Sequence, residues 1–434
     1  MGSAHRFLDY CLSTITFKKR EPSMTSVAQT RSRAQKTICL SALFLAWAVG
    51  YADRIVMSTA IIPIGKEFAL DAQQAGMVLS AFYVSYAIMQ LLGGLMSDRY
   101  GSRVVVVACV VAWSIFTALT SVAWSFTSLL VIRFLFGVGE GCFSPASSVT
   151  VAEVFPKQER ARAKAFLIST VFLGNAVGSG LVALTVVYLG WRGAFHILAV
   201  VGLLVSAVLW YALRSGIAQQ RVRTEPRESN QLGALIRDPA ALKLTAIWFC
   251  SSILYIGMIS WMPSYLMKHY QVDLLHIGLA SAIPYLIAFL GTNGVGWLLD
   301  KVGQDREKHF LMGGSLGCAA FLSLMITTTS ITLLVVYWTL CLLSFNFIYA
   351  TVFSVPLKRF RSNLIGSATG LMNFGGQIAG AVAPVVMGSL IVAFGGSYLS
   401  AFWFLVGAAL AAFLLSLTWR NPVPPLQQQG PAHA

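Results

Sequence analysis

Two acids and two arginines fall inside strongly apolar stretches of this sequence. Asp53 and Arg54 are adjacent in one such stretch, and Arg133 and Glu140 stand seven residues apart in another. A charged side chain is costly in a hydrophobic segment, so such charges are kept chiefly where they bind or move an ion. An arginine can hold a carboxylate through two parallel hydrogen bonds, and a carboxyl group removed from water takes up a proton more readily. The four residues therefore predict a path for an organic anion and a coupling ion.

Helix geometry suggests a role for each of these residues. Neighbouring residues on a helix point about 100° apart, so Asp53 and Arg54 could both approach one cavity at its edge. A spacing of seven is two turns, which places Arg133 and Glu140 on one helix face. A substrate carboxylate that arrives at Arg54 would favour protonation of a nearby acid, so Asp53 and Glu140 are candidate proton-coupling groups. Arg133 is a candidate for a second anion contact or a gate. The alternative is structural, with ion pairs that hold helices together.

The composition is that of a helical membrane protein. The chain has 434 residues, of which 57% are hydrophobic and 11% are charged, whereas soluble domains carry about 25% charged residues. Polar turns separate twelve apolar runs, each close to the roughly 20 residues that a spanning helix needs. The predicted spans are residues 38–62, 73–96, 104–123, 127–149, 165–189, 193–213, 241–266, 275–299, 309–327, 331–355, 364–393 and 397–418.

The distribution of Lys and Arg predicts the orientation of the spans. With the N-terminus in the cytoplasm, 26 of the 31 basic residues fall on cytoplasmic segments. Only Lys66, Arg192 and Lys268 fall on loops at the outer side of the membrane. This bias follows the positive-inside rule and predicts that both termini are cytoplasmic. The net charge of +15 does not indicate a nucleic-acid partner, because the basic residues form no stripe interleaved with aromatic residues. The seven cysteines are scattered without metal-ligand spacing, so we expect no metal site, no disulfide framework and no cofactor other than a coupling proton.

The sequence repeats itself at an offset of 202 residues. At this offset Asp98 corresponds to Asp300, and Asn175 corresponds to Gln377 with a glycine before each. Two similar halves predict a binding site between them, near the middle of the bilayer. We divide the chain into a cytoplasmic tail, a six-helix bundle, a cytoplasmic link, a second six-helix bundle and a second tail, at residues 1–37, 38–213, 214–240, 241–418 and 419–434.

Polar residues of both halves are predicted to line this site. Tyr255 is the counterpart of Asp53 at the repeat offset, so it should face the same cavity. The side chains expected to contact hydroxyl groups of the cargo are Tyr51, Tyr86, Tyr255, Asn175, Asn373 and Gln377. The alternative is that the amides form interhelical hydrogen bonds and the tyrosines anchor helix ends at the membrane interface.

A glycine- and charge-rich turn follows the second predicted span. We expect it to act as a conformational latch, in which charge pairs and helix ends close the cytoplasmic side in one state; the alternative is a solvated turn whose charge only sets topology. The latch residues are Gly94, Asp98, Arg99, Gly101 and Arg103, with Asp300 in the second half.

Several of these motifs resemble known families. The turn from Gly94 to Arg103 resembles the signature loop of the major facilitator superfamily, and the segment that ends at Asp300-Lys301-Val302-Gly303 resembles its second copy, although Asp305 stands at the position that corresponds to Arg103. Tyr51-Ala52-Asp53-Arg54 and the segment Arg133–Gly141 resemble the anion:cation symporter family. The resemblance covers roughly residues 38–420. It implies an all-α membrane protein with twelve transmembrane helices in two pseudo-symmetric six-helix bundles.

The resemblance also implies a function. It predicts proton-coupled uptake of a small organic anion, a sugar acid such as a hexuronate or aldonate, by a monomeric carrier in the lipid bilayer of a bacterial inner membrane. Carriers of aromatic carboxylates and sodium-coupled carriers are the alternatives within the same fold. A non-transporting sensor is a more distant one, because residues 1–36 and 214–240 are short and lack the hydrophobic pattern of a domain. We expect no enzyme, since the sequence has no nucleophile–base motif and no phosphate-binding loop.

Overall fold

Long apolar helices account for nearly all of the described chain. The computed structural model describes residues 33–214, 231–302, 306–359 and 365–419, and every structural statement below refers to these residues. They contain helices and connecting turns and no strand. The helices of the first part are α2 (Arg33–Glu67), α3 (Ala72–Tyr100), α4 (Ser102–Ser121), α5 (Phe126–Gly141), α6 (Phe143–Val154), α7 (Lys157–Ile168) and α8 (Thr170–Ala212). The later helices are α9 (Gln231–Arg237), α10 (Pro239–Tyr270), α11 (Leu274–Val302), α12 (Glu307–Thr327), α13 (Ile331–Arg359), α14 (Ile365–Ala393) and α15 (Tyr398–Leu417).

Eleven helical segments of the described chain are long and apolar enough to cross a membrane. One of them, residues 162–212, has 51 residues, which is more than twice the length that crosses a hydrocarbon core of about 30 Å. Its helix α8 is broken at Gly190, which has φ 69° and ψ 170°. These angles are readily adopted only by glycine, and they divide α8 into two arms of about 20 residues each. The all-helical membrane fold predicted from the sequence is confirmed, and the break explains why two spans were expected where the chain forms one interrupted helix.

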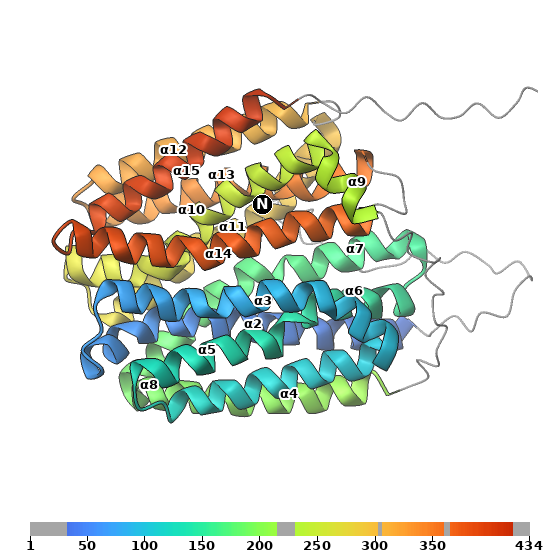
Figure 1. Cartoon of the computed structure of the whole chain (residues 1–434), viewed down its shortest axis with the longest axis horizontal. Helices are drawn as coiled ribbons and strands as arrows, with labels where there is room; N and C mark the ends of the chain where they lie inside the picture. The colour runs from blue at the N-terminus through green and yellow to red at the C-terminus, as the bar shows by residue number, and fades with distance from the viewer. Residues whose placement is uncertain (1–32, 215–230, 303–305, 360–364, 420–434) are drawn as a thin grey trace, which may run out of the picture. The chain divides into compact units, whose positions relative to one another are not determined.

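Two long helix–helix contacts join helices that lie far apart in the sequence. α3 packs along α14, which lies beside it in Figure 1, and α8 packs against α11. Most other large contacts join helices from the same side of the link between α8 and α9, such as α4 with α8 and α12 with α13. The contacts α3–α14 and α8–α11 therefore connect the segments that precede the link to those that follow it.

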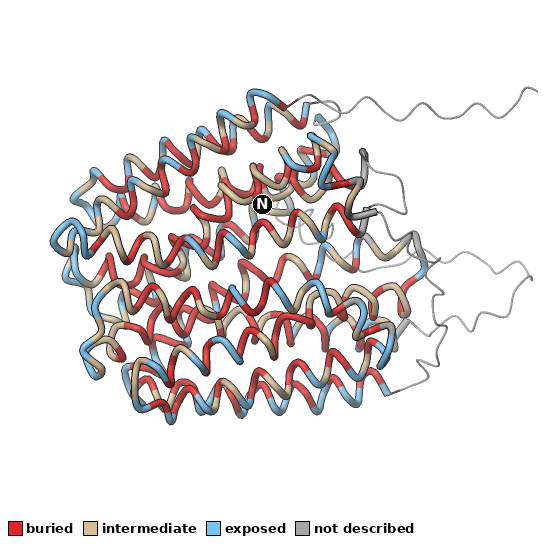
Figure 2. The backbone as a smooth tube through the Cα atoms, viewed as in Figure 1, coloured by how far each residue is buried: buried red, intermediate tan, exposed pale blue. Residues whose placement is uncertain are grey.

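The burial pattern fits a protein that faces lipid. Figure 2 shows buried residues along the helix faces that meet other helices and exposed residues on the opposite faces. Many of the exposed side chains are large and apolar, including Leu204 (62% exposed) and Leu414 (60% exposed). Exposed apolar surface of this extent is unfavourable in water but is satisfied by lipid chains.

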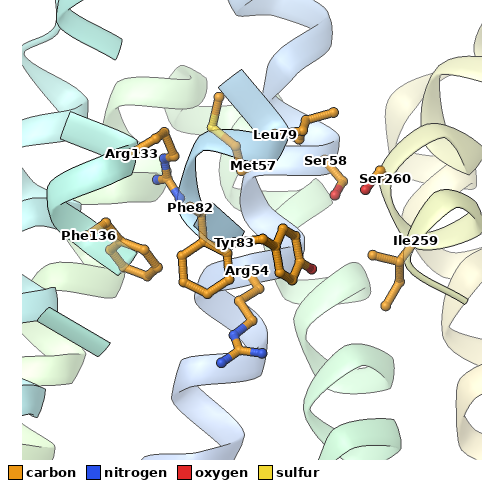
Figure 3. A pocket seen from close by; sticks show the side chains of 10 residues that line it. All are labelled: Arg54, Met57, Ser58, Leu79, Phe82, Tyr83, Arg133, Phe136, Ile259 and Ser260. Atoms are coloured by element: carbon orange, nitrogen blue, oxygen red, sulfur yellow. The ribbon is translucent and has the colours of Figure 1, made fainter. Parts of the chain in front are cut away.

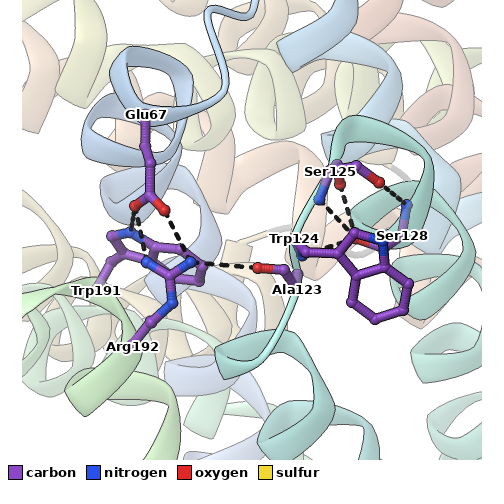
Figure 4. A network of polar contacts seen from close by, with 7 residues as sticks. All are labelled: Glu67, Ala123, Trp124, Ser125, Ser128, Trp191 and Arg192. Atoms are coloured by element: carbon purple, nitrogen blue, oxygen red, sulfur yellow. Dashed lines mark hydrogen bonds and ion pairs between the residues drawn. The ribbon is translucent and has the colours of Figure 1, made fainter.

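Polar contacts tie helix ends together at one end of the bundle (Figure 4). Glu67, the last residue of α2, accepts hydrogen bonds from the indole Nε1 of Trp191 and from Nη1 of Arg192, both at 2.8 Å. Arg192 also donates through Nη2 to the backbone oxygen of Ala123 at 3.3 Å. The break at Gly190 turns the chain so that Trp191 and Arg192 reach the end of α2.

Candidate functional site

Glycines allow the charged helices to approach their neighbours closely. A Cβ atom at Gly178 of α8 would lie 2.9 Å from the Cα atom of Ala52 in α2, and one at Gly141 of α5 would lie 2.9 Å from the backbone oxygen of Tyr86 in α3. A larger residue at either position would push the helices apart, because side-chain atoms do not pack this closely against a backbone. The small residues thus help to bring α2, α3 and α5 around one buried cluster of charges.

Arg54 of α2 is bonded to Glu140 of α5 and not to its sequence neighbour Asp53. Its Nε and Nη2 atoms both donate to Oε1 of Glu140, at 3.0 and 2.6 Å. The two side chains are only 14% and 4% exposed, so the pair is shielded from water. Oε2 of Glu140 is buried and has no hydrogen-bond partner in the described chain. One carboxylate oxygen is therefore engaged by the guanidinium while the other remains open to a proton.

Asp53 lies against α4. Its Oδ2 accepts a hydrogen bond from the hydroxyl of Thr117 at 2.6 Å, and both residues are buried. Its Oδ1 is buried without a partner among the described residues. A buried carboxylate with one unsatisfied oxygen carries a large desolvation cost in its charged form. Asp53 is therefore a second group at which a proton could be held.

Arg133 is a buried cation without an acid in direct contact. Its side chain is 2% exposed, and Nη2 makes a long hydrogen bond of 3.3 Å to the hydroxyl of Thr120. Its Nε has no hydrogen-bond partner in the described chain, and none of the ion pairs formed there includes Arg133. The guanidinium carbon lies 4.8 Å from the ring centre of Phe136 and 5.3 Å from that of Phe195.

Three aromatic rings surround the guanidinium of Arg54. Its carbon lies 4.6 Å from the ring centre of Tyr86, 5.0 Å from that of Phe82 and 5.1 Å from that of Tyr51. A cation over the faces of aromatic rings is stabilised by the negative potential of those faces. These rings also fix the direction in which the guanidinium can donate hydrogen bonds, and so define where a bound carboxylate would lie.

A central cavity borders this group through Arg54. It has a volume of about 130 Å³ and is lined by residues of α2, α3, α8, α10, α13 and α14. Among the described residues, Arg54 is the only charged one in its lining. Six of the residues predicted from the sequence line it, namely Tyr51, Arg54, Asn175, Tyr255, Asn373 and Gln377. The helices before and after the link both contribute, and the side-chain amide of Asn175 donates to the hydroxyl of Tyr255 across them at 2.9 Å.

A second, smaller cavity shares Arg54, Tyr83 and Ile259 with the central one. Its volume of about 20 Å³ is enough for about one water molecule. It is lined by Arg54 and Arg133 together with apolar and hydroxyl side chains from α2, α3, α5 and α10. In the view of Figure 3, the ring of Phe82 lies between the two guanidinium groups. Arg54 thus borders both cavities, whereas Arg133 borders only the small one.

The remaining predicted residues are placed differently. Asp53 and Glu140 line neither cavity, and Glu140 reaches the central one only through its bonds to Arg54. Tyr86 is buried with its ring 4.6 Å from the guanidinium carbon of Arg54, and it lines neither of these two cavities. The roles assigned to these residues stay predictions, because no contact with a cargo or a proton is observed.

The expected latch is described only in part. Gly101 separates α3 from α4 with φ 85°, a conformation that favours glycine. Arg103 donates to the backbone oxygen of Trp210 at 3.1 Å and lies over its ring at 4.0 Å, and Arg99 lies over the ring of Tyr100 at 5.4 Å. Gly94 and the side chains of Asp98 and Asp300 lie outside what the structure describes, so the proposed charge pairs are not tested.

Several lining residues were missed by the sequence interpretation. They are aromatic side chains of α10 and α13, namely Trp248, Phe345, Tyr349 and Phe353. Phe345, Tyr349 and Phe353 are four residues apart, which places them on one helix face and was a readable signal. Thr117, which binds Asp53, gave no such signal, because a threonine in an apolar helix usually bonds to the backbone of its own helix.

Comparison with known proteins identifies relatives of this chain. The family model described as Major Facilitator Superfamily matches residues 42–384. The chain is 29% identical to the hexuronate transporter of Bacillus subtilis (strain 168), over 88% of this chain and 94% of the relative. It is 30% identical to the probable sulfoacetate transporter SauU of Cupriavidus necator, over 88% and 93%. It is 27% identical to the probable L-galactonate transporter of Escherichia coli (strain K12), over 83% and 84%.

The same arrangement of helices occurs in a solved structure. A bacterial homologue of the human lysosomal transporter Spinster, in an inward-facing and occupied conformation, superposes with a TM-score of 0.76. The match covers 90% of this chain and 98% of the other, at 19% sequence identity. At this identity the likeness concerns the fold alone.

Proposed function

The chain belongs to the Major Facilitator Superfamily, and from this premise we propose that it is a secondary active transporter that moves an organic anion together with protons by alternating access. Its relatives are organic-anion transporters of the same superfamily, as the sequence resemblance predicted. At the coarser level, the chain is therefore a multi-pass membrane protein that carries a small organic anion. What we propose is that transport is coupled to protons and that it proceeds by alternating access.

The observation that carries the proposal is the position of Arg54. Of the side chains that the structure describes, it is the only charged one that lines the central cavity, and it is held by two hydrogen bonds to the buried acid Glu140. A cavity with one cation and no acid in its lining attracts an anion. The same cation is already neutralised by Glu140, so the anion must compete with that carboxylate for the guanidinium.

Protonation of Glu140 would resolve this competition. A neutral carboxyl group accepts weaker hydrogen bonds from a guanidinium than a carboxylate does. When Oε2 of Glu140 takes up a proton, Nε and Nη2 of Arg54, which both bond to Oε1 of Glu140, become free to hold the carboxylate of the cargo. Release of the cargo returns Arg54 to Glu140, which favours loss of the proton. Binding of cargo and binding of a proton thus support each other.

The charges of the cluster fit this exchange. Asp53, Arg54, Arg133 and Glu140 together carry no net charge when both acids are ionised. One proton leaves an excess of one positive charge, which one monovalent anion neutralises. A second proton, held at Asp53, would make the loaded carrier positive. Each charge moved across the membrane then contributes about 2.3 kcal/mol per 100 mV, so the dependence of uptake on potential distinguishes the two stoichiometries.

Close contacts at one end of the helices support alternating access. A Cβ atom at Gly76 of α3 would lie 2.4 Å from the backbone oxygen of Pro384 in α14, and one at Gly278 of α11 would lie 2.7 Å from that of Ser179 in α8. Two six-helix bundles, residues 38–213 and 241–418, could rotate relative to each other about these contacts between glycine and the facing backbone. With the cytoplasmic termini that the Lys and Arg bias predicts, the tight contacts lie on the outer side, and this state is closed outward.

The names of the relatives suggest the cargo only in broad terms. They are described as carriers of hexuronate, L-galactonate and sulfoacetate, so a sugar acid is one candidate for this chain. We further propose that the carrier acts as a monomer in a plasma membrane, as the sequence resemblance implies.

Reconstitution tests the proposal directly. Purified protein in proteoliposomes should accumulate labelled organic acid when the outside pH is lowered, at constant sodium on both sides. A sodium gradient at constant pH should have no effect. Accumulation that follows sodium and ignores pH would replace the proton by sodium as the coupling ion.

A further inference from the structure

Lys164 of α7 is a half-buried cation whose side chain reaches two other helices. Its Nζ atom donates to the hydroxyl of Ser148 in α6 at 2.7 Å and lies 5.6 Å from the ring centre of Trp47 in α2. None of the ion pairs that the described residues form includes Lys164, and the nearby acid Glu159 pairs with Lys36 at 3.0 Å. Within the described chain, the positive charge of Lys164 therefore has no counter-ion.

Trp47 adds a second donor that lacks a partner. It is 9% exposed, and its indole Nε1 is buried without a hydrogen-bond partner among the described residues. An indole N–H can only donate, and an ammonium group likewise has donors and no acceptor. An unpaired buried donor is costly, so the two groups together favour a ligand that accepts hydrogen bonds and carries negative charge. A carboxylate has both properties.

Trp47 continues the face of α2 that borders the central cavity. Trp47, Tyr51 and Arg54 are four and then three residues apart, which is the spacing of one helix face. The rings of Trp47 and Tyr51 stack at 5.6 Å with an angle of 24°, and both Tyr51 and Arg54 line the cavity. The indole is therefore one turn of α2 beyond the cavity wall.

Lys164 continues a cavity-facing stripe in the same way. It precedes Val171 and Asn175 of α8 by seven and eleven residues, which are about two and three helical turns. Ser169, between α7 and α8, keeps the helical angles φ −61° and ψ −19°, so the helical path continues through it. Because Val171 and Asn175 both line the central cavity, Lys164 extends their stripe beyond it.

These two residues lie on the cytoplasmic side of Arg54 in the orientation that the Lys and Arg bias predicts. Trp47 precedes Arg54 by seven residues, which is about 10 Å along α2. Since the tight contacts lie on the outer side, cargo that leaves Arg54 in this state moves toward the cytoplasm. The pair of Arg54 and Glu140 is then neutral, whereas Lys164 still offers a positive charge along the way.

We propose that Lys164 and the indole of Trp47 form a second anion contact, which holds the carboxylate of the cargo on the cytoplasmic side of the central cavity after it leaves Arg54. This inference rests on the proposed function and adds a site of release to it. The contact acts on cargo that enters from the cytoplasm or leaves toward it, and not on cargo that binds from outside.

Membrane vesicles of the two orientations test this contact, because each exposes one side of the carrier. Initial rates of downhill entry are measured at equal pH on both sides with labelled glucuronate, galactonate, gluconate and sulfoacetate, and the acid that the unchanged protein carries fastest is used for the variants. In Lys164→Gln we expect the KM in inside-out vesicles to rise by about tenfold, because one hydrogen bond to a charged group is lost. The KM in right-side-out vesicles should stay within about twofold.

Two further variants separate binding from a structural or topological role. Lys36→Gln removes the same charge from the same side of the membrane and should leave both KM values unchanged. Trp47→Phe keeps an aromatic ring, removes the N–H donor and should raise the KM on the cytoplasmic side by about threefold. Because KM does not depend on the amount of inserted protein, a loss of expression in any variant does not affect the comparison.

The outcomes distinguish this contact from the transport function itself. An unchanged cytoplasmic KM in Lys164→Gln would overturn the contact and leave the transport function standing; this is also the result expected if Lys164 only sets topology or binds a lipid phosphate. An equal rise in KM on both sides would likewise overturn it. Failure of the unchanged protein to carry any of the four acids would count against both proposals.

Discussion

Replacement of Arg54 by lysine keeps the positive charge and removes the geometry that our proposal depends on. The guanidinium donates two hydrogen bonds to Oε1 of Glu140, at 3.0 and 2.6 Å, and lies within 5.1 Å of three ring centres. A lysine ammonium is a compact, strongly hydrated charge that cannot present the same pair of donors. The same loss applies to the cargo carboxylate that takes the place of Glu140.

The expected magnitude follows from these contacts. One hydrogen bond to a charged group contributes about 1.5–3 kcal/mol, and cation–ring contacts in a desolvated site contribute about 0.5–2 kcal/mol. Because the pair is shielded from water, with exposures of 14% and 4%, little of this is lost to solvent screening. A total of about 2–4 kcal/mol predicts a fall in uptake efficiency of about thirtyfold to several hundredfold in Arg54→Lys.

The assay is the initial rate of proton-driven uptake in proteoliposomes over a range of cargo concentrations, normalised to inserted protein. Arg192→Lys is the matched control. Arg192 pairs with Glu67 at side-chain exposures of 42% and 40%, away from both cavities, and exposed pairs contribute only about 0.2–1 kcal/mol. Near-normal efficiency in both variants would refute the view that Arg54 binds cargo through a bidentate contact.

Three other predictions concern the acids and the helix contacts. Glu140→Gln should retain cargo exchange and lose pH-driven accumulation, since glutamine resembles the protonated acid; retained accumulation would remove Glu140 from coupling. Thr117→Val should change the rate of proton-driven uptake by about tenfold, because it removes the hydrogen bond of 2.6 Å that Oδ2 of Asp53 accepts; an unchanged rate would contradict a role of Asp53 in coupling. Gly278→Ala should lower the melting temperature in detergent, because its Cβ would lie 2.2 Å from Cβ of Ala183. The control Gly180→Ala has no atom within 4 Å of the added Cβ and should be neutral or stabilising; equal effects would argue against the tight contact.

The repeat in the sequence was a sound guide to the cavity. The offset of 202 residues predicted that Tyr255 faces the binding site and that Asn175 and Gln377 correspond, and all three line the central cavity. Asp53, from which the position of Tyr255 was inferred, does not line it and is bonded to Thr117. A repeat fixes which helix faces are equivalent, but a small rotation of one helix decides whether a given side chain reaches the cavity or a neighbouring helix.

The partner of Arg54 could not be read from the chain. Asp53 is its neighbour in sequence, yet Arg54 is bonded to Glu140, 86 residues away. The adjacent side chains point in different directions on α2, so their partners depend on which helix lies on each side. That arrangement depends on packing between α2, α4 and α5, which no local pattern encodes.

The sequence by itself determined the class of the protein, because apolar runs of spanning length, the bias of positive charge and charges at membrane depth each have one dominant physical meaning. It also singled out Arg54 and Glu140, which the structure joins by hydrogen bonds, although it did not pair them. Only the tertiary structure decided that Glu140 is bonded to the cation of the cavity, that Thr117 is bonded to Asp53, and that aromatic rings of α10 and α13 line the cavity. The reason is that these contacts join residues far apart in the chain, and their distances follow from how closely the helices pack.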